Sequence, residues 1–174
     1  MRMPHPLKRR VVLAVSVAAV LIAVSAGVTD YYIIHNGSTA VDHTNCTDPD
    51  SISSHVYNPY RLTIIKSCIT ASGIVENVFS EADGDYHVRL ALDPQYSNLT
   101  NSANDQYQYG DLVVEIVCAL PITQSDAVSA CQNYANNITI PNINDHITVT
   151  GPYVLDTDHS NWAEIHPAYT LTIS

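Results

Sequence analysis

The sequence predicts an all-β domain with one short helix, preceded by an apolar N-terminal helix. Residues 61–174 contain five segments rich in apolar and β-branched residues, with turn-forming Gly, Asn, Asp and Ser between them. Within this part only residues 125–135 show a helical apolar stripe. The 174 residues amount to about one domain, and a content of 46% hydrophobic and 14% charged residues excludes a disordered chain.

The N-terminus carries an export signal. Residues 1–10 are a basic flank, and residues 11–28 (VVLAVSVAAVLIAVSAGV) are 18 residues without a charge, about 27 Å as a helix. Two interpretations stay open for residues 11–34: an uncleaved signal anchor with its flank in the cytoplasm, or a secretory signal peptide cut after Val24-Ser25-Ala26. Both export the rest of the chain, either as a single-pass cell-membrane protein with an extracytoplasmic C-terminal domain or as a secreted one.

Residues 35–58 lack periodicity and are rich in Ser, Thr, Asn and Asp, which predicts a flexible linker before a domain at 59–174. Four cysteines in an oxidising compartment predict two disulfides, for which three pairings exist. The short separation favours Cys118 with Cys131, which leaves Cys46 with Cys68. A zinc site is disfavoured because no close CxxC spacing is present. In a source that glycosylates, four sequons are candidate acceptors: Asn36, Asn45, Asn98 and Asn137.

The predicted elements follow in order. Residues 61–79 form a long strand interrupted by Gly73, where a bulge or bend allows one strand to serve both halves of a curled sheet. Residues 86–93 alternate, with His87 on the face opposite the apolar one, and residues 112–118 are an apolar run. Residues 125–135 form the helix, with Ser125 as N-cap. The last two strands are residues 146–155 and 164–173.

This order, three strands, a helix and two strands with a bent first strand, resembles the OB-fold, a five-stranded, partly open Greek-key barrel. The resemblance covers about residues 60–174 and rests on element order. The alternative, an all-β sandwich, needs more strands. The OB-like resemblance implies ligand binding on the face of strands two and three, edged by residues 80–85 (SEADGD) and 156–162 (DTDHSNW).

The first loop has two interpretations. Asp83, Gly84 and Asp85 suit a tight turn, and the two carboxylates also suit a hard divalent cation. The Asp-Gly-Asp sequence is similar to a motif of the OB-related staphylococcal-type nucleases, in which an acidic residue at that turn helps to hold calcium. That family also needs arginines to hold phosphate, and beyond the linker this chain has only Arg61 and Arg89.

The second loop and the strand after it concentrate reactive side chains. If Ile165, Leu171 and Ile173 face the core, Glu164 and His166 lie together on the outer face, which suits a metal pair or a general acid and base. The alternative is structural: His166 bonds Glu164 or a carbonyl, and Trp162 plugs the barrel end. The candidate ligand-binding residues are Asp83, Asp85, His87, Asp156, His159, Trp162, Glu164 and His166, and the candidate metal ligands among them are Asp85, His159, Glu164 and His166.

The charge limits the partners. The chain has a net charge of −10, and beyond residue 10 three basic residues face seventeen acidic ones. This argues against nucleic acid and favours a cation or a basic partner. No G-x-S-x-G or phosphate-binding glycine loop is present. We therefore expect a membrane-tethered or secreted binding module for a cation, glycan or protein, without catalysis and with no cofactor beyond a divalent cation. The alternative is a nuclease-like metal-dependent hydrolase that uses the first loop with Glu164 and His166.

Overall fold

The computed structural model describes residues 46–174. The basic flank, the apolar segment at 11–34, the first part of the expected linker and the sequons at Asn36 and Asn45 lie outside the described residues. No helix within residues 46–174 has the length and apolar character that a membrane span requires.

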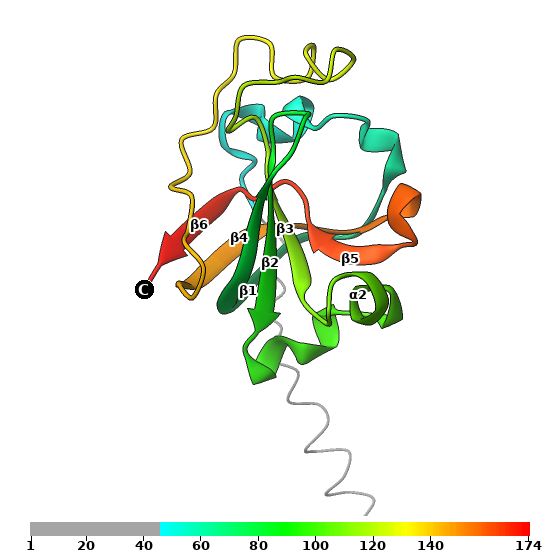
Figure 1. The fold of residues 1–174 in the computed structure, drawn as a ribbon, viewed down its shortest axis with the longest axis vertical. Coiled ribbons are helices and arrows are strands. Elements are labelled where there is room, and N and C mark those ends of the chain that lie inside the picture. Colours follow the sequence, from blue (N-terminus) through cyan, green and yellow to red (C-terminus); the bar gives the residue numbers. More distant parts are fainter. Residues whose placement is uncertain (1–45) are drawn as a thin grey trace, which may run out of the picture. The chain divides into compact units, whose positions relative to one another are not determined.

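Six strands form one sheet that closes on itself (Figure 1). The order is β1-β2-β3-β5-β4, and β4 returns to β1, which completes a ring of five strands. Strand β6 lies beside β4 outside this ring, and every pairing is antiparallel except that of β3 with β5. The strands are β1 (Leu62–Ser80), β2 (Tyr86–Leu92), β3 (Leu112–Ile116), β4 (His146–Asp156), β5 (Trp162–Ile165) and β6 (Thr170–Ile173).

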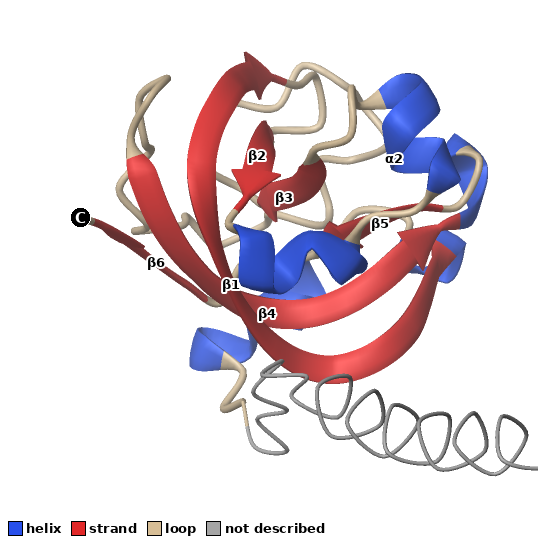
Figure 2. Ribbon diagram, turned by 90° about the horizontal axis from the view of Figure 1, so that it is seen from below, coloured by secondary structure: helices blue, strands red, loops and turns tan. Residues whose placement is uncertain are grey.

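Strand β1 belongs to both halves of the ring. It pairs with β4 from Leu62 to Ile74 and with β2 from Gly73 to Ser80, so Gly73 faces Ile147 on one side and Leu92 on the other. The register shifts near Val75 and between Ile64 and Ile69. These irregularities let β1 curve beside β4 around the barrel, as Figure 2 shows. The strand therefore serves both halves of the sheet, as predicted, and its pairings with the two halves meet at Gly73.

The predicted helix at 125–135 is wrong. Residues 125–133 form a series of turns, and Cys131 in this segment is tied to Cys118 by a disulfide. The α-helix within residues 46–174 is α2 (Ser102–Tyr107), between β2 and β3. Asn101 caps it in a reciprocal box with Asn104, and the Asn104 amide bonds the Ala163 carbonyl of β5. Local capping and a tertiary hydrogen bond therefore stabilise a helix in a segment for which the sequence pattern predicted none.

The predicted strand at 164–173 is divided. It becomes β5 and β6, because the chain leaves β4 at His166-Pro167, where Pro167 has no N–H to donate. The Ala168 N–H bonds the Glu115 carbonyl and the Tyr169 N–H bonds the Thr150 carbonyl. Ile165 faces the core as predicted, whereas Ile173 is 42% exposed.

The main core fills the barrel. It includes Val88, Leu90, Val114 and Ile165, all fully buried. The Asn98 and Asn137 side chains, both in sequons, are exposed.

A second, smaller core lies under the N-terminal segment, where Ile52 and Val56 pack on Val117 and Cys118. We expected residues 35–58 to be a flexible linker, but residues 46–58 instead pack on the barrel. The 3₁₀ helix Pro49–His55 forms in this segment, and a second, Pro59–Arg61, directly follows the segment. The disulfides join Cys46 to Cys68 and Cys118 to Cys131, which is the expected pairing.

Candidate functional site

A row of charged side chains crosses the outer face of β2, β3 and β5. His87 faces Glu115 across the β2–β3 pair, and Glu164 lies in β5 with His166 directly after it. Their sequence neighbours Val88, Val114 and Ile165 point into the core, so period-two alternation puts all four on the opposite side. For His87, Glu164 and His166 this is the face that the sequence predicted. The four side chains are nevertheless buried, with 1–7% exposure, instead of lying at the surface.

His87 and Glu115 form a buried ion pair. His87 Nδ1 lies 2.8 Å from Glu115 Oε1 and Nε2 lies 3.2 Å from Gln108 Oε1, so both ring nitrogens donate. Burial by itself lowers the pKa of His87, but the bond to Glu115 and its charge raise it to about 9. Burial works to raise the pKa of Glu115, and the bond from His87 brings it below its ordinary value. Both groups are therefore charged at neutral pH.

Glu164 has two neighbours of its own. Trp162 Nε1 donates to Glu164 Oε2 at 3.0 Å, and His166 Nδ1 lies 3.2 Å from Glu164 Oε1. The first contact matches the structural interpretation of Trp162, since its indole N–H is satisfied. The pKa of His166 is lowered by burial and raised by the bond to Glu164, with a net rise.

Two atoms of this cluster lack partners. Among the described residues, Glu115 Oε2 and His166 Nε2 are buried and have no hydrogen-bond partner. Glu115, Glu164 and His166 each present one donor atom within 4.8 Å of the others. Carboxylate oxygens and imidazole nitrogens are ligands for divalent metals. A second set, Glu81, His87 and Glu115, has the same geometry and shares Glu115.

An open cavity of about 500 Å³ lies at the rim of this face. Glu81 lies between the cavity and the buried charged side chains. Its carboxylate is 4.0 Å from His87 Nδ1, and its side chain is 43% exposed. Both loops singled out in the sequence line this cavity, together with residues of the N-terminal segment, Arg61 and Gln124. The lining residues are Tyr57, Asn58, Arg61, Ser80, Glu81, Ala82, Asp83, Gln124, Asp158 and His159.

Asp156 holds the second loop together. Its buried carboxylate accepts hydrogen bonds from the Asp158 and His159 N–H groups and lies 3.0 Å from Arg61 Nε. It also lies 2.9 Å from His159 Nδ1, and the His159 ring stacks on Trp162 at 4.6 Å. With these partners Asp156 orients the loop, and His159 and Asp158 reach the cavity.

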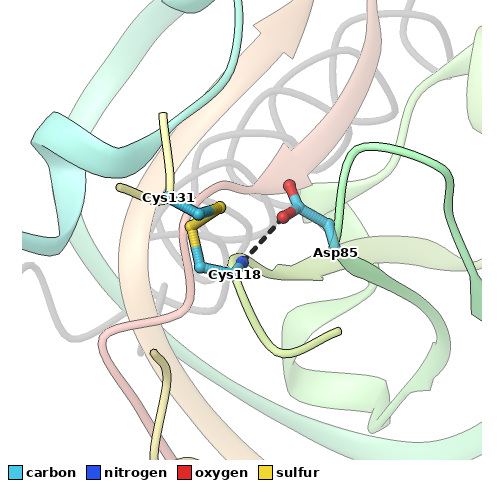
Figure 3. Close-up of side chains that lie close together, drawn as sticks. All are labelled: Asp85, Cys118 and Cys131. Atoms are coloured by element: carbon cyan, nitrogen blue, oxygen red, sulfur yellow. Dashed lines mark hydrogen bonds between the residues drawn. A yellow bond between two sulfur atoms is a disulfide. The ribbon is translucent and has the colours of Figure 1, made fainter. Parts of the chain in front are cut away.

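The Asp-Gly-Asp loop behaves as a turn. Gly84 has φ +101°, and its carbonyl accepts from the Ala119 and Leu120 N–H groups. Asp85 is buried and accepts from the Cys118 N–H at 2.8 Å, as Figure 3 shows. Cys118 and Cys131 lie close enough to Asp85 for a metal set, but their sulfurs are joined in a disulfide. Burial raises the pKa of Asp85 to about 7, and the charge of Asp83 adds to the rise.

The structure therefore divides the predicted site residues. Glu164 and His166 share a cluster with Glu115 in place of the Asp85 and His159 that we expected, and His87 supports it. Asp83 and His159 line the rim cavity instead. Our predictions omitted Glu115, Glu81, Gln108 and Arg61. Glu115 had a visible signal, since it is the one charge inside the apolar run at residues 112–118.

Comparison of the chain with protein-family models, characterised proteins and solved structures finds no match.

Proposed function

We propose that this chain is an exported, OB-like binding module that holds a cationic group, an ammonium or guanidinium, in the rim cavity. The observation that carries the proposal is that the β1–β2 loop and the loop after β4 line one cavity. In OB domains the loops at these two positions border the ligand site. A five-strand ring with a long shared first strand supports that relation, although the helix lies before β3 instead of after it.

The charge around the cavity favours a cationic group. Glu81, Asp83 and Asp158 line it. The basic residue on the same wall, Arg61, is already engaged, since its guanidinium contacts Asp156 and donates to the Tyr57 carbonyl at 3.2 Å. The acidic carboxylates are therefore left to attract a ligand of opposite sign.

Export is supported by two features. The four cysteines form two disulfides, which persist in oxidising compartments. The uncharged segment at residues 11–28 has the length of an anchor or signal sequence. Together they favour a module displayed at, or released from, the outer face of a membrane.

Calorimetric titration of the full chain in mild detergent with a lysine-rich peptide tests the proposal. We expect binding that weakens as salt is raised, and a loss of about tenfold in affinity in the variant with Glu81→Gln and Asp83→Asn. The control is Glu76→Gln, an exposed acid on β1 outside the cavity, which should bind as the unaltered chain does. Equal affinity in both variants, or binding of a neutral oligosaccharide in place of the peptide, would contradict the proposal.

A further inference from the structure

We propose that Glu115, Glu164 and His166 form a buried site for one divalent transition-metal ion, with zinc as the ion that best fits the donor set. The three donors come from β3 and from the end of β5, which are parallel neighbours. The site lies beneath the rim cavity and is separate from it. It therefore does not depend on a cationic ligand binding there.

The geometry is close to that of a metal centre. One donor atom from each residue lies within 4.8 Å of the other two. Donors around a tetrahedral zinc ion lie roughly 3.4 Å apart, because each bond is roughly 2.0–2.2 Å long. Small side-chain rotations that draw the donors inward are therefore enough to bring all three to bonding distance.

Glu115 offers an unpartnered buried oxygen beside the His166–Glu164 pair. His166 Nδ1 lies 3.2 Å from Glu164 Oε1, so an ion that displaces the proton between them binds the ring nitrogen and the carboxylate together. On Glu115 the bond with His87 uses Oε1 and leaves Oε2, which has no partner among the described residues. A cation bound at Oε2 would satisfy this oxygen.

The surroundings fit a metal site as well. His87 and Trp162 hold the two carboxylates by hydrogen bonds, which fixes donor orientation. The overlapping set of Glu81, His87 and Glu115 leads from the half-exposed Glu81 carboxylate to the interior. These side chains provide a polar path by which an ion can reach the buried donors.

Metal analysis of the full chain tests the site. The protein, purified in mild detergent with its disulfides intact and stripped with a chelator, is dialysed against zinc. We expect one zinc per chain, and affinity at least about tenfold lower in Glu115→Gln and in His166→Gln. Glu76→Gln, an exposed acid distant from the set, is the matched control and should keep full affinity. Cobalt in place of zinc should give visible absorption bands that His166→Gln alters.

No stoichiometric zinc in the folded, unaltered chain, or unchanged zinc affinity in both variants, would overturn the site. If neither variant folds, the unaltered chain decides: zinc must raise its melting temperature and cobalt must give the bands, and the absence of both overturns the inference. A crystal soaked in zinc with only water between Glu115 and His166 would also overturn it. The variant with Asp83→Asn and Asp158→Asn separates the two proposals, because both acids line the rim cavity and neither belongs to a metal set: it should lose peptide binding and keep zinc.

Discussion

At the scale of single residues, the buried acids differ in how their charge is balanced. Glu115 faces His87 and Asp156 faces Arg61, so both carboxylates meet a cationic partner. Desolvation of a carboxylate is unfavourable, and such a partner offsets it. Asp85 accepts only a neutral N–H from Cys118 and lies near the charge of Asp83. Burial therefore raises the pKa of Asp85 to about 7.

Asp85 should make stability fall as the pH rises. Its pKa rises from an ordinary value of 3.8 to about 7 on folding, so between these values the unfolded chain has lost the proton that the folded chain retains. The contribution of Asp85 to the free energy of unfolding therefore decreases from about pH 4 to about pH 7 and levels off above. Asp85→Asn removes this slope, and its stability relative to the unaltered chain should increase across the window by up to about 4 kcal/mol.

Urea denaturation of both proteins at several pH values between 4 and 8 measures the difference. If the free energies of unfolding of the two proteins differed by the same amount at every pH, Asp85 would be ionised in the folded state across this range.

At the scale of elements, β1 is the strand on which closure depends. At Gly73 it pairs with β2 and β4 together, and the backbone of Ala91 comes close to it. A Cβ added at Gly73 would lie 2.9 Å from the Ala91 carbonyl carbon, closer than real Cβ atoms approach. The absence of a side chain at Gly73 is therefore required by packing.

Gly73→Ala should destabilise the barrel by roughly 1–3 kcal/mol, because the backbone of β2 must shift to admit the methyl group. Chemical denaturation monitored by circular dichroism measures the change. Ser80→Ala, at the exposed end of the same strand, is the control and should change stability by less than about 0.5 kcal/mol. If Gly73→Ala were as stable as the control, the close approach to β2 would not matter.

Strands were predicted better than the helix for a physical reason. In residues 86–93 the alternation reflects a core on one side only, and β2 forms there. Residues 125–135 offered a stripe of only a few apolar positions, and the disulfide at Cys131 holds them in turns. The stripe of a short segment cannot outweigh such a tertiary constraint.

At the scale of the whole molecule, the N-terminal segment packs firmly on the barrel. Its 3₁₀ helix Pro49–His55 places Ile52, 1% exposed, on Val117, and the Cys46–Cys68 disulfide joins the segment to β1. Tyr57 of this segment lines the rim cavity, as does Arg61 shortly after it. The cavity therefore depends on this packing.

Ile52→Ala should lower the free energy of unfolding by about 2–5 kcal/mol, because it leaves a cavity in the second core. Tyr60→Ala is the control: this side chain is 96% exposed, so its removal should change stability little. Thermal and urea denaturation compare the two. Equal, small effects would mean that the segment packs only loosely on the barrel.

The sequence by itself determined what depends on local pattern: the strand segments, the shared strand at Gly73, the cysteine pairing, and the placement of Glu164 and His166 side by side. These follow from alternation, spacing and short chain distance. Only the tertiary structure decided that Glu115 joins them, that their outer face is buried, and that both loops line one cavity. Those facts depend on which strands become neighbours and on what the N-terminal segment covers, and such contacts join residues that lie far apart in the chain.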